Sequence, residues 1–161
     1  MADLAQPRFV DRGALTVAGF FRDYKPDGLG QIPLQWNALQ QQLQLVSGRV
    51  GGDAFGVWYG VLNGGGAFHY LSGVAVGEYA PVHPQFSRAS IAAQHYAVFE
   101  HRGSPQEIRK TMDAILGQWL PKSGRTLVRG DENTPDFFER YSEEFNSTGS
   151  GQIEIWVPIQ K

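Results

Sequence analysis

A carboxylate and a large aromatic ring lie two residues apart near the end of the chain, at Glu154 and Trp156. They alternate with Ile153, Ile155 and Val157, and a period of two is typical of a β-strand, whose alternate side chains lie on opposite faces. The aliphatic face is expected to pack on a core. Glu154 and Trp156 are therefore expected to lie side by side on the other face.

The chemistry of this pair depends on what covers it. In water, Glu154 is an ordinary surface carboxylate or an ion-pair partner of Arg140 on a neighbouring strand. In an apolar pocket the charged form loses its hydration, and a bound organic cation would restore the counter-charge while stacking on Trp156. We favour the second alternative, which predicts a site for flat, amphipathic, cationic compounds.

The elements that must position these residues occur in the same order twice. In the first half they are an extended segment, a helix and two strands, at residues 14–21, 32–46, 54–62 and 68–76. In the second half the same elements are expected at residues 89–101, 108–120, 137–145 and 152–159. Ser104, Pro105 and Glu107 form a capping box at the start of the second helix.

This strand–helix–strand–strand order, present twice, predicts an α+β fold. An antiparallel sheet would carry both helices on one face and leave a ligand groove on the other. We expect a single domain over residues 1–161, with halves at about 8–82 and 83–161.

Composition limits the classes of function. The chain has 14 basic and 16 acidic residues and a net charge of −2, so direct binding to nucleic acid is not expected. There is no cysteine, and the four histidines are scattered, so neither a metal nor a cofactor is expected. No signal peptide and no long apolar run is present, which predicts a cytoplasmic protein without a membrane span.

Five segments together resemble the gyrase-inhibitor-like (GyrI-like) effector-binding domain, the ligand-sensing domain of many AraC- and MerR-type transcription regulators. They are residues 68–76, 96–103, 119–124, 135–141 and 154–159. The resemblance implies the duplicated fold and a groove between its halves. It also implies binding of amphipathic or aromatic, often cationic compounds by a buried glutamate within a ring of aromatic side chains, as in multidrug binding.

The resemblance extends to particular residues. Glu154 lies where the terminal strand of the family carries its acidic residue, and Trp156 matches the neighbouring aromatic residue. Glu139 and Tyr141 match the Glu-x-Tyr of the penultimate segment. These four residues are expected to bind the ligand, with Glu154 as the main contact because of the strand face on which it lies.

Two further aromatic residues, Trp58 and Tyr96, are expected in the groove. Trp58 alternates with the apolar residues of its segment, so its side chain is expected on the opposite face of the strand from theirs. Tyr70 shares its strand phase with apolar residues and is assigned to the core. Trp36 and Trp119 lie on apolar helix stripes and are also assigned to the core.

The resemblance leaves other functions open. Some GyrI-like proteins hydrolyse reactive cyclopropane-bearing compounds, and Glu154 or Glu139 would then activate a water molecule. A third alternative is inhibition of a partner protein such as a topoisomerase, for which the charge of −2 gives little support. The sheet edges are also compatible with a homodimer. Because the resemblance begins by residue 8, we expect a stand-alone binding module without a DNA-binding domain. Binding is favoured over catalysis, and the question of an enzyme stays open.

Overall fold

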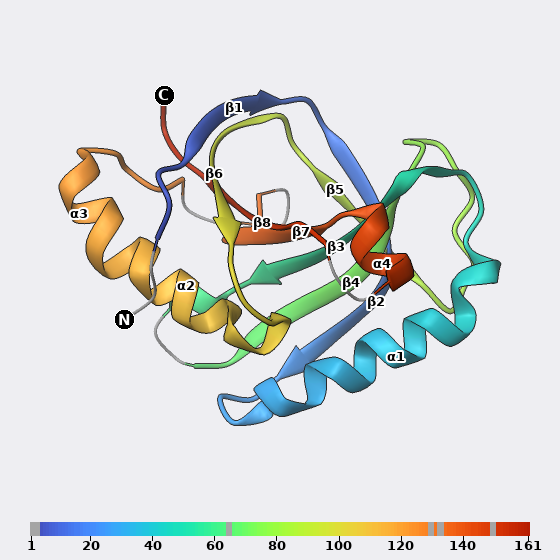
Figure 1. Cartoon of the computed structure of the whole chain (residues 1–161). Coiled ribbons are helices and arrows are strands. Elements are labelled where there is room, and N and C mark those ends of the chain that lie inside the picture. The colour runs from blue at the N-terminus through green and yellow to red at the C-terminus, as the bar shows by residue number, and fades with distance from the viewer. Residues whose placement is uncertain (1–3, 64–65, 129–130, 132–133, 149–150) are drawn as a thin grey trace.

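The computed structural model describes residues 4–63, 66–128, 131, 134–148 and 151–161. In these residues eight strands form one antiparallel sheet, in the order β1-β6-β8-β7-β3-β4-β2-β5 (Figure 1). The strands of the first half are β1 (Arg8–Arg12), β2 (Leu15–Tyr24), β3 (Arg49–Tyr59) and β4 (Phe68–Val76). Those of the second half are β5 (Ser87–Ile91), β6 (Gln94–His101), β7 (Phe137–Tyr141) and β8 (Ile153–Pro158).

The helices are α1 (Ile32–Gln42), α2 (Ile108–Ala114), α3 (Leu120–Ser123) and α4 (Glu143–Thr148). A π-helical segment, Ile115–Trp119, joins α2 to α3. The predicted capping box precedes α2, where the backbone N–H of Ser104 donates to the Glu107 carboxylate at 3.1 Å. In the described part of the chain, no helix has both the length and the apolar character that a bilayer span requires.

The strand order is symmetric. If β1 to β4 are exchanged with β5 to β8, the same order is read from the other edge, with β3 and β7 as neighbours at the centre. Each half thus repeats the predicted order, preceded by one additional short strand, so the α+β class is confirmed. Figure 1 shows α1 and α2 on the same side of the sheet.

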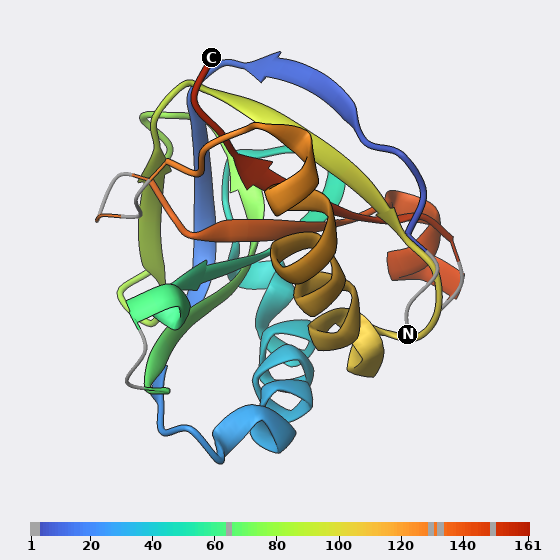
Figure 2. The same cartoon turned by 90° about the vertical axis from the view of Figure 1, so that its left-hand side faces the viewer.

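The sheet is curled (Figure 2). Each of its faces carries its own apolar core. On the helix side, residues such as Phe99, Ile115 and Ile155 are buried beneath α2 and its neighbours. On the opposite side, Phe138 stacks on Trp156 at 5.5 Å between ring centroids, inside the curl. Side chains therefore fill the centre of the face on which the sequence predicted a groove.

The prediction of an extended segment over residues 137–145 was wrong for its last residues. β7 ends at Tyr141, and α4 begins at Glu143. The Ser142 hydroxyl accepts a hydrogen bond from the backbone N–H of Phe145 at 3.1 Å, which is the interaction of an N-cap. The helix turns Phe145 toward the core on the helix side of the sheet.

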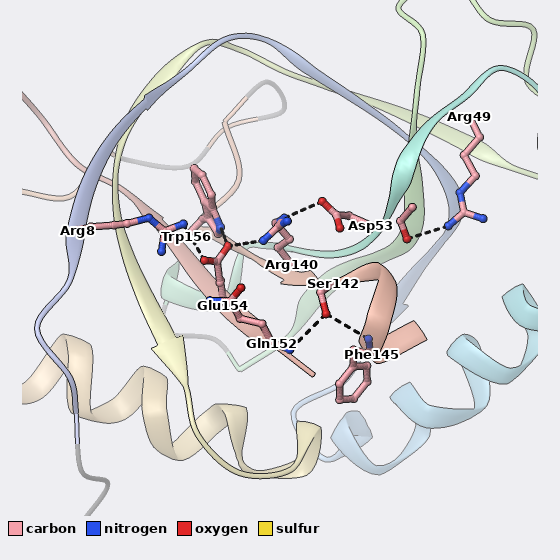
Figure 3. A network of polar contacts seen from close by, with 10 residues as sticks. Arg8, Arg49, Asp53, Arg140, Ser142, Phe145, Gln152, Glu154 and Trp156 are labelled. Carbon is pink, nitrogen blue, oxygen red and sulfur yellow. Dashed lines mark hydrogen bonds and ion pairs between the residues drawn. The ribbon is translucent and has the colours of Figure 1, made fainter. Parts of the chain in front are cut away.

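A ladder of charged side chains crosses the other face (Figure 3). Arg8 from β1 pairs with Oε2 of Glu154 at 2.7 Å, and Arg140 from β7 pairs with Oε1 at 2.8 Å. Arg140 also binds Asp53 at 2.8 Å, and the Trp156 indole donates to Glu154 at 3.2 Å. Glu154 is 1% exposed, and two guanidinium groups of the protein compensate its charge.

We predict that Arg140→Leu lowers the free energy of unfolding by about 3 kcal/mol, because it removes one of the two cations that pair with the buried Glu154 and the cation that pairs with Asp53. The matched control is Asp113→Asn on α2, whose carboxylate is 70% exposed and pairs with Arg109 at 3.6 Å. This control should change stability by less than about 1 kcal/mol. Urea unfolding measures both, and equal losses would contradict the assigned role of the ladder.

Candidate ligand-binding site

A cavity of about 540 Å³ lies between α1 and the start of α2, above the centre of the sheet. This volume falls within the range of roughly 300–1,000 Å³ that is usual for small-molecule sites. Its walls are largely apolar and aromatic, and they include Leu29, Ile32, Pro33, Trp36, Trp58, Tyr70, Ile108, Tyr141 and Phe145. The cavity is therefore on the helix side, not on the face where the sequence predicted the groove.

A single carboxylate, that of Glu139 on β7, lies among the described lining residues. Glu139 is 2% exposed. Its Oε1 accepts hydrogen bonds from the hydroxyls of Tyr70 at 2.8 Å and Tyr141 at 3.1 Å. No cationic side chain in the described part of the chain pairs with it, since the guanidinium in the lining, Arg109, pairs with Asp113.

Gly56 makes room for this carboxylate. It is the cross-strand partner of Glu139 at the centre of the sheet. A Cβ atom at position 56 would lie 2.1 Å from Oε1 of Glu139 and 2.1 Å from the Tyr70 hydroxyl oxygen. Only a residue without a side chain therefore permits the hydrogen bond between Tyr70 and Glu139.

The electrostatics of the site follow from its burial. Burial raises the pKa of Glu139 to about 7, although the hydrogen bonds from Tyr70 and Tyr141 and the nearby Trp58 indole N–H lower it. The Trp58 indole N–H makes no hydrogen bond of normal geometry with a described residue, so its effect on this pKa is that of a nearby dipole. Burial, and then the Glu139 charge, raise the pKa of Tyr70 and of Tyr141 well above the usual value. Both phenols therefore stay protonated and donate.

Aromatic rings surround the carboxylate. The Trp36 indole N–H donates to the Tyr70 hydroxyl at 2.9 Å, which in turn donates to Glu139. Trp58 meets Tyr70 edge to face at 4.8 Å between centroids, and Trp36 meets Tyr141 in the same way at 5.3 Å. Ring faces attract cations, so the walls and the base of the cavity favour the same sign of charge.

The predicted site residues fall into two groups. Glu139, Tyr141 and Trp58 line the cavity together. Glu154, Trp156 and Tyr96 lie on the opposite face of the sheet. Burial raises the pKa of Glu154, but hydrogen bonds from Arg8 and Arg140 outweigh it and the net pKa is lowered.

Two residues that the sequence pattern assigns to the core, Tyr70 and Trp36, line the cavity. Both are on the helix side, as their phase predicts, but there the core is interrupted by the cavity. Nothing in the sequence shows that Trp58 and Tyr70 are neighbours, and the structure pairs them across β3 and β4. Two large amphipathic rings side by side indicate a polar partner between them.

An apolar cavity with one buried carboxylate defines a small-molecule binding domain. Residues 5–160 match the GyrI-like small molecule binding domain, and the chain belongs to this family. The resemblance noted in the sequence is therefore confirmed.

Similar proteins include a transcriptional regulator and two solved structures. Transcriptional regulator BrlR of Pseudomonas aeruginosa is 29% identical over 158 residues, covering 94% of this chain but 54% of BrlR, so the chain spans about half the length of this relative. The structure of SAV2435 bound to tetraphenylphosphonium has a TM-score of 0.70 at 20% identity, covering 97% of this chain and 94% of that one. A hydrolase from Listeria innocua has a TM-score of 0.56 at 12% identity, covering 99% and 94%. At these identities the two structures show the fold alone.

We predict that Glu139→Gln changes how stability depends on pH. The folded pKa of about 7 lies above the ordinary value of 4.5, so the group stabilises the fold at low pH and this contribution is lost as pH rises through 7. Between pH 5 and 8 the free energy of unfolding of the variant should rise by about 3 kcal/mol relative to that of the parent. Urea unfolding at both pH values measures the difference.

The matched control is Glu100→Gln, which removes an exposed carboxylate from β6. It should follow the parent over the whole pH range. If Glu139→Gln also follows the parent, Glu139 is not buried as a carboxylate that titrates near neutral pH.

Proposed function

We propose that this domain binds amphipathic aromatic cations in the cavity between α1 and α2, with Glu139 as the counter-charge. The observation that carries the proposal is a carboxylate, 2% exposed and without a cationic partner among the described residues, at the base of an aromatic-walled cavity. Tyr70 and Tyr141 orient it, while Trp36 and Trp58 supply ring faces.

The energetics support a cation as the ligand. A buried carboxylate without a cation is disfavoured in its charged form, which is why its pKa is raised. A bound cation would restore the charged form, and each ring face would add about 0.5–2 kcal/mol. Burial of the apolar body of the ligand adds about 25 cal/mol per Å². Such a site selects the sign of the charge and an aromatic shape, with little demand on exact substituents.

The relatives support the same ligand class. SAV2435, which shares the fold, was solved with tetraphenylphosphonium, an aromatic cation. The Listeria innocua hydrolase shows that a protein described as an enzyme can share this fold. In this cavity the described lining contains no histidine, serine or threonine, so hydrolysis would depend on Glu139 alone as a base. Binding therefore requires less of the site than catalysis does.

We further propose that the domain acts through its ligand and not through direct contact with nucleic acid. Its net charge of −2 provides no electrostatic attraction to a phosphate backbone.

We predict that the parent binds tetraphenylphosphonium saturably and that Glu139→Gln weakens binding at least tenfold, about 1.4 kcal/mol. The substitution keeps the size of the side chain but removes its charge. Trp36 and Trp58 line the cavity, so quenching of tryptophan fluorescence measures the affinity.

Glu154→Gln is the matched control, because that carboxylate is already paired with Arg8 and Arg140. It should leave the affinity within about twofold, provided that urea unfolding shows a folded protein. Tetraphenylborate, an anion of the same shape, should not bind in this cavity. Equal effects of the two glutamate substitutions would contradict the proposal.

The affinity for tetraphenylphosphonium should also depend on pH. Because only the ionised carboxylate attracts the cation, binding should weaken by up to about tenfold per pH unit below the Glu139 pKa of about 7. Titrations from pH 5 to 8 measure this slope. Glu139→Gln should show weak binding that is independent of pH, and a flat profile in the parent would mean that Glu139 is not the counter-charge.

A further inference from the structure

A second cavity, of about 690 Å³, lies on the face of the sheet opposite the helices. It is formed where β1, β2 and β5 meet the beginning of β3. Its described lining includes Arg12, Leu15, Val50, Gly51, Asp53, Phe55, Val76, Glu78, Ser90 and Ile91. None of its lining residues belongs to the first cavity, so the two are separate sites.

An irregularity in β3 opens this cavity. Arg49 pairs with Val76 and Ala54 pairs with Val74, so residues 50–53 lie opposite a single residue of β4. Extra residues of this kind bend a strand away from its neighbour and redirect its side chains. Gly51 has a φ of +73° and open space around its Cβ position, which permits the bend. The bend also places Asp53 beside Arg140.

Arg12 is the cationic side chain of this cavity's described lining, and it forms no ion pair with a described residue. Its guanidinium lies over the rings of Phe55 at 5.5 Å and Trp156 at 5.1 Å. Among the described residues it forms no ion pair and no hydrogen bond, so its N–H donors are free for a ligand. Burial, and then the like charge of Arg140, lower the pKa of Arg12.

The two carboxylates nearest to Arg12 are paired with other arginines. Asp53 is bound by Arg140, and Glu154 is bound by both Arg140 and Arg8. Of these three arginines, Arg12 is the one that forms no ion pair with a described residue. Glu78, at the exposed rim, is the remaining carboxylate of the lining, and it opposes an anion.

We propose that this second cavity binds an organic anion with an apolar body, such as an aromatic carboxylate or sulfonate. Arg12 donates hydrogen bonds to the anionic group, while Leu15, Phe55 and Ile91 contact the apolar body. Planar guanidinium groups match the geometry of such oxyanions. The proposal does not rest on cation binding at Glu139, because the two cavities lie on opposite faces of the sheet.

The test is a comparison of two fluorescent probes of the same shape. Anilinonaphthalene sulfonate carries the anionic group, and phenylnaphthylamine lacks it. The parent should bind the sulfonate more tightly than the neutral probe. Arg12→Gln should weaken binding of the sulfonate at least tenfold and leave the neutral probe unchanged. Arg12→Lys, which keeps the charge but loses the planar donors, should retain only part of the affinity for the sulfonate.

Three further variants distinguish binding in this cavity from binding elsewhere on the protein. Arg22→Gln removes another arginine that stacks on a phenylalanine, Phe20 at 5.6 Å, and should have no effect. Glu139→Gln, in the first cavity, should also have no effect. Glu78→Gln should strengthen binding of the sulfonate about twofold or more, because it removes a negative charge from the rim.

The proposal is overturned if Arg12→Gln, shown to be folded by urea unfolding, binds the sulfonate as tightly as the parent. It is equally overturned if tetraphenylphosphonium displaces the sulfonate and Glu139→Gln alters sulfonate binding, since the probe would then occupy the first cavity. If Arg12→Gln does not fold, Glu78→Gln still decides the question, because it should strengthen binding of the sulfonate but not of the neutral probe. A sulfonate affinity unchanged in Glu78→Gln would then count against it.

Discussion

A carboxylate removed from water must find a cation, find hydrogen bonds or hold a proton. The central strands of this sheet carry two buried glutamates, and each meets this constraint differently. Glu154 is held by Arg8 and Arg140, so its charge is satisfied within the protein. Glu139 receives hydrogen bonds from two tyrosines but no cation from the described residues, and its pKa rises to about 7. The first glutamate stabilises the fold, and the second remains available to a ligand.

The rest of the architecture maintains this difference. β7 is central in the sheet, so its alternate side chains face two separate environments, with Glu139 on the helix side and Arg140 on the other. α1 and α2 cover the helix side without meeting over Glu139, which leaves the cavity. On the opposite side, arginines from β1 and β7 enter the curl (Figure 3). One sheet thus carries an aromatic cavity with a buried carboxylate on one face and, on the other, a cavity with an arginine that is unpaired among the described residues.

Much of the fold could be predicted because local patterns determine it. Alternation in β8 placed Glu154 and Trp156 opposite the aliphatic residues, and the capping box marked the beginning of α2. The choice between the two glutamates depended on contacts that no local pattern shows. The register of β7 against β8 sets Arg140 opposite Glu154, and a slip of one residue would have exchanged the faces. That β1 brings Arg8 across the sheet is likewise a consequence of the curl, not of the residues near Glu154.

The two halves of the sheet differ at the cross-strand pair of Gly56 and Glu139. β3 and β7 are equivalent strands and also neighbours, so the position opposite Glu139 belongs to the other copy of the repeat. Two glutamates there would place like charges directly opposite each other, and even a methyl group would occupy the space of the carboxylate. The site therefore requires two different residues at this cross-strand pair, a carboxylate on β7 and no side chain on β3.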